Sequence, residues 1–208
     1  MADEVIITID IMASIGANSG AEVETANAPP AGGDGAASDG WTVEEGSNLG
    51  FIAMQQGSEV KGSFDKFDAL IVFDADDLDN SRLDVDIDVT SINSGHGDRD
   101  KTLNSPSFFD TAKWPAAAFK SDQIVAKEEG QYEALGTLTI RDVTLDVVLP
   151  FALEITPSED DPARELAHAK GELPILRLDY GVGQGDWTST TTVADEVIIT
   201  VDIMASRP

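Results

Sequence analysis

Residues 144–155 read TLDVVLPFALEI, and this stretch decides the fold class. Its large apolar side chains occupy alternate positions: Leu145, Val147, Leu149, Phe151, Leu153 and Ile155. Successive side chains of an extended chain point to opposite faces, so the spacing predicts a long strand with one buried face. Pro150 lies on the other parity and predicts a bend or an edge position there.

The same alternation recurs along the chain. In RLDVDIDVTSI (82–92), apolar Leu83, Val85, Ile87 and Val89 alternate with Asp84, Asp86, Asp88 and Thr90. Further strand-like stretches cover 49–56, 59–75, 116–127, 131–140, 172–178 and 194–206. About eight long strands with one buried face indicate an antiparallel sandwich or barrel. Their length favours a barrel of about eight strands, which is wide enough to hold one small ligand.

Two segments predict helical structure. Ser105 could cap a short helix that Pro106 enters, within SPSFFDTAKW (105–114). A helical turn is also expected after Asp161, before the strand ELPILRL (172–178).

The two ends of the chain carry the same segment. Residues 2–14 (ADEVIITIDIMAS) and 194–206 (ADEVIITVDIMAS) differ only at Ile9 against Val201. Both copies predict a strand, and Asp3, Glu4 and Asp10 argue against a signal peptide in the first copy. Residues 15–40 are rich in Gly, Ala, Pro and Asp and predict a flexible linker. We therefore expect a folded domain over 41–208, preceded by a linker and by a 1–14 remnant of an earlier tandem module.

The composition excludes several classes of function. The chain has 208 residues, a formal charge of −26, with 39 acidic against 13 basic side chains, and no cysteine. Nucleic acid is excluded as a partner and loose adhesion to anionic lipid is disfavoured, because both need clustered Lys and Arg. Disulfides and thiolate metal sites are excluded as well. The acidity is consistent with a highly solvated surface or with a saline habitat.

Motifs for other chemistry are weak. His96, Asp98 and Asp100 could form a metal corner, but only His168 could add a second imidazole. DADDLDN (74–80) lacks the glycine and glutamate of a calcium loop. No Gly-x-Ser-x-Gly elbow is present, and Gly183-Gln184-Gly185 does not fit a nucleotide loop.

One long stretch resembles the YceI-like polyisoprenoid-binding family. The shared motifs are Ser91-Ile92-Asn93-Ser94, Arg99-Asp100, Leu103, Phe108-Phe109-Asp110, Pro115, Phe119, Ser121, and Gly136 to Arg141. The stretch VKGSFDKFDALIVFD upstream and DYGVGQGDW (179–187) downstream also match. Two positions depart from the family pattern: Asp142 replaces a glycine, and Thr102 replaces a histidine. The turn at Asp142 is therefore expected to be reshaped.

The resemblance implies a lipocalin-like antiparallel barrel with a cavity for an isoprenoid chain, such as a polyprenyl phosphate or a quinone tail. It implies no other cofactor. It also implies export to the periplasm, and some members of the family are fused to a cytochrome b-type membrane domain. A homodimer is left open.

The candidate ligand-binding residues fall into three sets. The inward parity gives a lining of Phe51, Val85, Ile87, Val89, Leu138, Ile140, Val147, Leu149 and Phe151. An aromatic cluster either roofs the cavity or plugs one end of the barrel: Phe108, Phe109 and Trp114. Arg99 and Arg141 could meet a polar head group, or each could pair with a nearby aspartate.

Three functions are weighed. The leading hypothesis is a non-enzymatic carrier of an isoprenoid lipid. The second is an accessory domain with a filled barrel, whose acidic face docks a membrane redox partner. A lipid-modifying enzyme ranks last, because no pair of nucleophile and base is visible. Parity says which side chains share a face, but it does not say whether that face encloses an empty space.

Overall fold

The computed structural model describes residues 40–208. This part of the chain forms one antiparallel sheet with a single α-helix, α1 (Gly97–Asn104). The strands are β1 (Thr42–Val43), β2 (Asn48–Gln55), β3 (Ser58–Phe64), β4 (Phe67–Val72), β5 (Arg82–Asp88), β6 (Ile92–Asn93), β7 (Ala116–Ala126), β8 (Gln131–Ile140), β9 (Val143–Pro157), β10 (Glu165–Leu176) and β11 (Val193–Arg207). The predicted strand at 1–14 and the linker up to residue 39 lie outside the described residues.

The 11-stranded sheet closes into a barrel of eight long strands. Three of these long strands each consist of two shorter strands that follow one another along the chain. The pairing order is β4-β5-β7-β8-β9-β10-β11-β2-β3-β6, and β1 also pairs with β11. β1 and β2 follow one another along β11, β3 leads into β4, and β5 leads into β6. Counting each pair as one strand leaves eight around the barrel. β3 joins β6 at one end, and a bridge between Trp41 and Ile71 joins β1 to β4 at the other. The predicted barrel is confirmed.

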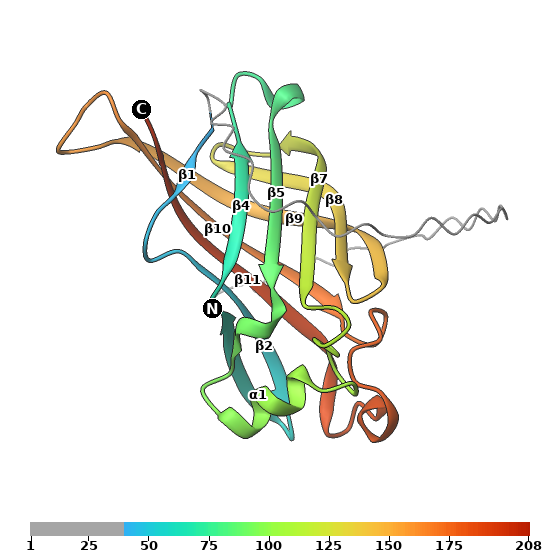
Figure 1. Cartoon of the computed structure of the whole chain (residues 1–208). Coiled ribbons are helices and arrows are strands. Elements are labelled where there is room, and N and C mark those ends of the chain that lie inside the picture. Colours follow the sequence, from blue (N-terminus) through green and yellow to red (C-terminus); the bar gives the residue numbers. More distant parts are fainter. Residues whose placement is uncertain (1–39) are drawn as a thin grey trace, which may run out of the picture. The chain divides into compact units, whose positions relative to one another are not determined.

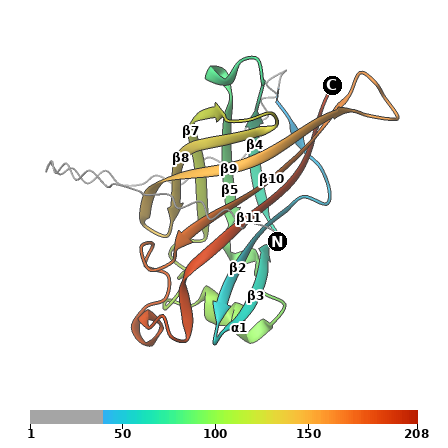
Figure 2. The same cartoon turned by 180° about the vertical axis from the view of Figure 1, so that it is seen from behind.

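Figure 1 shows β4, β5, β7 and β8 side by side, with β9, β10 and β11 crossing behind them at an angle. The view from behind shows the same three long strands on the near side (Figure 2). Both views place α1 at one end of the barrel, which we call the lower end, and the projecting β9–β10 hairpin at the other. None of the helices within 40–208 is long and apolar enough to cross a membrane.

The alternation of apolar and polar residues along the strands decides which side chains face the inside of the barrel. Ile87 of β5, Leu149 and Phe151 of β9 and Ile203 of β11 are buried, whereas Asp86 and Pro150 between such positions are exposed. One kink in the wall depends on a glycine. The β7–β8 register shifts between Ser121 and Gln123, and a Cβ on Gly136 would overlap the Lys120 carbonyl group there.

The helix lies earlier than predicted. Ser105 ends α1 as its C-cap instead of starting a helix, and its backbone is extended (φ −72°, ψ 164°). The residue before a proline is sterically pushed out of the α region, so Pro106 stops the helix at this point. Asp98 and Asp100 stand in the first turn of α1, where carboxylates are favoured.

A single hydrogen-bonded turn follows Asp161, in which the Arg164 amide donates to the Asp161 carbonyl (2.9 Å), but no helix continues from it. β10 begins at Glu165 and pairs with β9 on one side and β11 on the other, so His168 belongs to a strand. Small alanines at 163, 167 and 169 suggested a helix in isolation, but pairing on both sides outweighs this weak local preference. Arg141 and Asp142 form the tight turn between β8 and β9, and Arg141 has a positive φ of 58° there.

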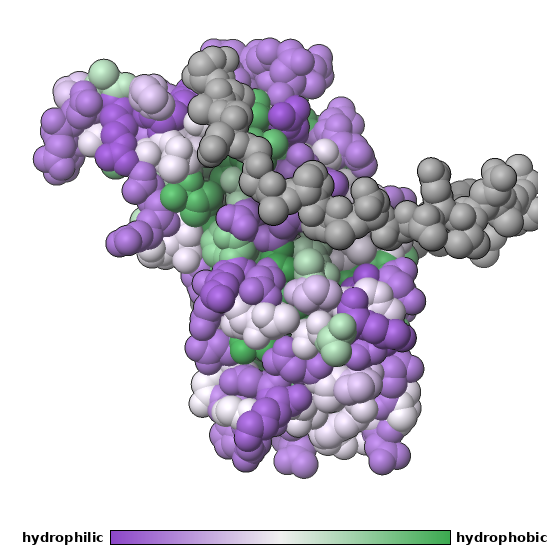
Figure 3. Space-filling model, viewed as in Figure 1, coloured by the Kyte–Doolittle hydropathy of each residue, from purple (hydrophilic) through white to green (hydrophobic). Residues whose placement is uncertain are grey.

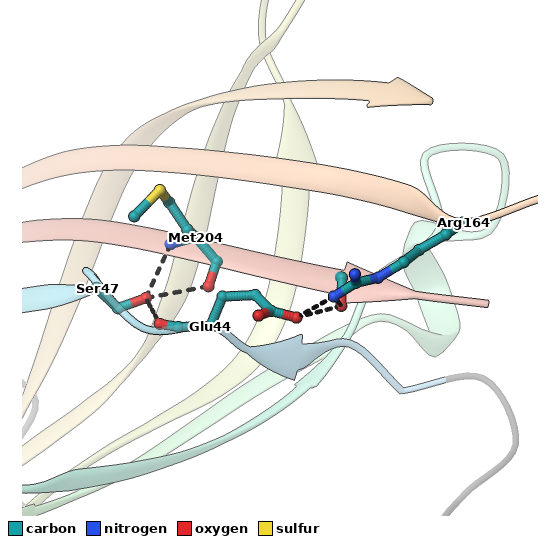
Figure 4. A network of polar contacts seen from close by, with 5 residues as sticks. Glu44, Ser47, Arg164 and Met204 are labelled. Carbon is teal, nitrogen blue, oxygen red and sulfur yellow. Dashed lines mark hydrogen bonds and ion pairs between the residues drawn. The ribbon is translucent and has the colours of Figure 1, made fainter. Parts of the chain in front are cut away.

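A polar contact network covers the break between β1 and β2. The Ser47 hydroxyl donates to the Met204 carbonyl (3.0 Å) and accepts from the Met204 amide (3.0 Å), so β11 keeps its hydrogen bonds where its partner strand is interrupted (Figure 4). Close by, Glu44 accepts from Ser206 (2.5 Å) and from Arg164 (2.5 Å). The Ser206 hydrogen bond, followed by the charge of Arg164, holds the pKa of Glu44 below its ordinary value.

This network predicts a pH-dependent effect of Ser206→Ala. A carboxylate with a lowered pKa stabilises the fold above its unfolded-state pKa and loses that contribution as the pH falls through its folded-state value. Ser206→Ala removes the largest cause of the shift. We therefore expect the variant to be less stable than the parent protein at pH 7 and the two to converge as Glu44 becomes protonated. Urea unfolding at pH 7 and pH 3 measures this, and an equal difference at both values would contradict it.

Candidate functional site

The barrel interior holds a chamber toward its upper end. The chamber contains about 1100 Å³ of space free of protein atoms, including the part that opens to solvent. All its lining side chains are apolar: Trp41, Leu49, Phe67, Ala69, Ile71, Phe73, Leu83, Val85, Ile87, Phe119, Leu138, Leu149, Phe151, Leu153, Ala167, Ala169, Leu173, Ile199, Val201, Ile203 and Ala205. Such a wall can bury hydrocarbon but offers no side-chain partner to a polar group.

A second chamber lies toward the lower end and contains about 860 Å³ of space free of protein atoms, including the part that opens to solvent. It shares four wall residues with the first: Leu49 of β2, Ile87 of β5, Leu138 of β8 and Ile199 of β11. These four come from strands spaced around the barrel, so the chambers adjoin at a ring of side chains that we call the waist. Together they extend along the barrel from the β9–β10 end to α1.

Most residues predicted as lining do face this space. Val85, Leu149 and Phe151 line the upper chamber, Ile87 and Leu138 form part of the waist, and the lower chamber is lined by Phe51, Val89, Phe108, Phe109 and Ile140. Val147 packs against the core but lines neither chamber. The pairing of β9 with β10 ends at the Phe151–Gly171 pair. Val147 lies on the part of β9 before Phe151, which is not paired with β10.

Two polar side chains of the lower chamber were not predicted, Arg177 and Tyr180. Arg177 is only 3% exposed, and its guanidinium group donates to the carbonyl oxygens of Ala194 (2.9 Å), Val182 (2.9 Å), Trp187 (2.9 Å) and Val193 (3.0 Å). A guanidinium has five N–H donors, so one remains on Nη1. The sequence did carry a signal, because Arg177 continues the buried parity of Leu173 and Ile175.

Burial shifts the pKa values of both groups. It lowers the pKa of Arg177, and the charge of Asp195 opposes this shift. It raises the pKa of Tyr180, and the charge of Asp179 adds to this. Arginine titrates so high that it stays charged, and Tyr180 stays a neutral hydroxyl at pH 7. Both side chains line the lower chamber with carbon atoms, because no polar atom reaches the surface of that chamber.

Two loops close the lower end of the barrel, one containing Phe108 and the other containing Gly181, and Arg141 is hydrogen-bonded to both. Its Nη1 donates to the Phe108 carbonyl (2.9 Å) and to the Gly181 carbonyl, and its guanidinium lies 4.5 Å from the ring centroid of Trp114. Phe108 packs against Trp187 with ring centroids 5.2 Å apart. Arg141 and Trp114 thus hold the closure from outside and line neither chamber, whereas Phe108 and Phe109 form part of the chamber wall.

The remaining polar candidates are committed elsewhere. Arg99 donates to the Ser94 carbonyl (3.2 Å) and does not line the cavity. Asp100 accepts from the amide and hydroxyl of Ser94, Asp98 pairs with Lys101, and His168 pairs with Asp202 (2.6 Å). Within residues 40–208, no three His, Asp or Glu side chains gather as a metal site would require.

The upper chamber reaches one side of the barrel where β4 lacks a full partner. Within 40–208, β4 pairs with β5 along its length but meets the β1 side only at the Trp41–Ile71 bridge. Phe67 and Ala69, just before this bridge, line the chamber. Figure 3 shows hydrophobic residues at the middle of this face, framed by hydrophilic ones.

Fold and site together define a class: a small antiparallel β-barrel whose interior contains two chambers with apolar surfaces. The YceI-like domain family model matches residues 41–205, the whole of this barrel. The chain belongs to the YceI-like family, as its sequence motifs predicted.

Individual relatives agree with this assignment. A UPF0312 protein of Vibrio cholerae is 38% identical over 125 residues, which cover 60% of this chain and 66% of the relative. The match thus spans just under two thirds of that relative's own length. Among solved structures, Burkholderia cenocepacia BcnA is similar with a TM-score of 0.71 and 28% identity, over 78% of this chain and 98% of BcnA. A polyisoprenoid binding domain from Saccharophagus degradans has the same fold (TM-score 0.61, 16% identity, 81% and 98% covered).

Proposed function

We propose that this barrel binds and carries an isoprenoid lipid, with the hydrocarbon chain in the two chambers. The observation that carries the proposal is the continuous apolar wall on both sides of the waist. An isoprenoid chain has no polar atoms, so its affinity comes from surface removed from water, about 25 cal/mol per Å². Membership of the YceI-like family and the named ligand class of the Saccharophagus degradans domain support the assignment.

The chambers favour a carrier over the alternative of an accessory domain with a filled barrel. Tightly packed interiors have few voids larger than a water molecule. The centre of a water-sized sphere can move through about 130 Å³ of the upper chamber and about 110 Å³ of the lower one, roughly ten times the volume that holds a single water.

The polar groups favour a neutral head, such as a quinone, over a polyprenyl phosphate. A phosphate needs several free charge-assisted donors, whereas Arg177 has four of its five N–H groups on backbone carbonyls. At the upper end, Arg164 and Arg207 are paired with Glu44 and Glu165. A quinone is uncharged, so it loses less hydration than a phosphate on entering an apolar chamber.

A titration tests the head group. A prenylated quinone and a polyprenyl phosphate with the same number of isoprene units are added to the delipidated protein, and binding is followed by tryptophan fluorescence. We expect the quinone to bind at least about 10-fold more tightly, because the phosphate would lose its hydration without replacement. Tighter binding of the phosphate would contradict the neutral-head proposal, and no binding of either would contradict the carrier proposal.

A further inference from the structure

The barrel wall divides where β9 and β10 separate, at a place that we call the fork. The two strands pair from their hairpin as far as Phe151 and Gly171, and Figure 2 shows them diverging beyond this pair. From there, residues 143–150 of β9 pair only with β8, and residues 172–176 of β10 pair only with β11. Within residues 40–208, no backbone hydrogen bond joins these two segments.

Two prolines keep the strands apart at the fork. Leu153 donates its amide toward the β8 side (2.8 Å), and alternate residues of a strand direct their backbone groups to the same side, so the nitrogen of Pro150 faces β10. Arg177, directly after β10, donates its amide to β11 (2.9 Å), so the nitrogen of Pro174 faces β9. A proline has no N–H, so neither edge can offer the other a complete ladder.

Both edges of the fork carry apolar side chains outside and inside. Outside, Val148 of β9 is 45% exposed and Leu176 of β10 is 46% exposed, the highest values among the large apolar side chains of residues 40–208. Inside, Leu149 and Leu173 line the upper chamber, and Ile175 lines the lower one. A hydrocarbon chain in the fork would therefore touch apolar side chains from the outer surface to the chambers.

The fork lies beside the waist and borders both chambers. Leu138 of the waist is the Cα partner of Leu145, which belongs to the β9 edge of the fork. The side of the barrel next to β4 differs in this respect, because Phe67 and Ala69 line the upper chamber alone. A long chain that enters at the fork can extend one part into each chamber.

Hydrogen bonds between elements close the two ends of the barrel, in contrast to the fork. At the upper end, the Trp41 indole donates to the Phe73 carbonyl (3.0 Å), and the Arg207 guanidinium lies 4.5 Å from the Trp41 ring centroid. At the lower end, Arg141 connects the two closing loops. Passage through either end must break these contacts, whereas passage through the fork moves side chains without breaking a strand ladder.

We propose that the lipid enters and leaves the barrel sideways through the fork, between β9 and β10. The inference rests on the proposed function, because it concerns the path of the same ligand.

A linker across the fork tests this route, since the chain has no cysteine of its own. The β9–β10 register, continued past Phe151, sets Val148 opposite Pro174, and both residues are exposed. Val148→Cys with Pro174→Cys is joined by a bis-maleimide linker that contains a reducible disulfide. The matched control is Ala152→Cys with Lys170→Cys, which are Cα partners on the paired part of the same two strands.

Transfer of a prenylated quinone to and from phosphatidylcholine vesicles is followed by stopped-flow tryptophan fluorescence. We expect the linker across the fork to slow uptake and release about 10-fold or more, because opening of the wall then limits both steps. The Kd should stay the same, reduction of the linker should restore both rates, and the control pair should transfer the quinone at the rate of the unlinked protein.

Equal rates for the two linked proteins would overturn the proposal and place the route at an end of the barrel or beside β4. A changed Kd with an unchanged release rate would also contradict it, because blocking a route changes rates and leaves the equilibrium alone. Failure of the carrier proposal would look different: neither double variant would bind the quinone before linking.

Discussion

Ile87→Asp is expected to abolish lipid retention, lowering affinity about 100-fold or more. Ile87 is 8% exposed and belongs to the waist, so a chain that occupies both chambers must pass it. A carboxylate there would either ionise beside hydrocarbon or draw water into the waist. Either result removes the apolar contact on which the binding depends.

The matched control is Asp86→Ala, one residue away on the outer face of β5. It should leave lipid retention unchanged, and equal losses from the two variants would show that the inward parity is assigned wrongly. A second variant guards against misfolding of Ile87→Asp. Ala69→Phe adds only hydrocarbon to the upper chamber, so it should displace a long-chain ligand while the barrel keeps its far-UV circular dichroism.

Gly183→Ala is expected to destabilise the fold by roughly 3 kcal/mol, among the largest effects of a single methyl group. Gly183 has a φ of +97°, which strains any other residue, and a Cβ there would overlap Nη1 of Arg177. Arg177 cannot simply move away, because its hydrogen bonds satisfy four backbone carbonyls of the closing loop and β11. The substitution therefore breaks the lower closure as well as straining the turn.

Gly185→Ala separates these two causes. Gly185 also has a positive φ (+63°), but no atom lies within 4 Å of its expected Cβ. We expect it to cost about 1 kcal/mol from backbone strain alone. Urea unfolding of both variants measures the difference, and equal losses would mean that Arg177 does not restrain this turn.

The sequence predicted the barrel because the signal is strictly local. The alternation in 82–92, 144–155 and 194–206 needs no knowledge of neighbouring strands, and most of the inward residues it marks line the chambers; Leu145, Val147 and Ile155 do not. It failed at two places, the first for a local reason and the second because of distant strand pairing. Pro106 ended a helix that Ser105 was expected to begin, and pairing with β9 and β11 made a strand of the segment around His168.

The candidate site was predicted for its hydrocarbon wall but not for its polar groups. Arg99 and Arg141 stood out as charges within family motifs, yet both donate to backbone carbonyls away from the chambers. Arg177 can be buried at the cavity because backbone carbonyls of the segment that follows it accept hydrogen bonds from its guanidinium group. A strand pattern does not reveal these contacts. Whether the interior is empty also depends on the size of the whole barrel. The periplasmic location and the cytochrome b-type partner stay predictions from the family resemblance.

Native mass spectrometry of the intact protein, purified from a bacterium without added lipid, tests the central claim most directly. We expect a complex in a 1:1 ratio with a lipid of discrete mass, which tandem fragmentation identifies as an isoprenoid, and its loss in Ile87→Asp but not in Asp86→Ala. Protein that carries no lipid and takes up neither quinone nor polyprenyl phosphate would contradict the account.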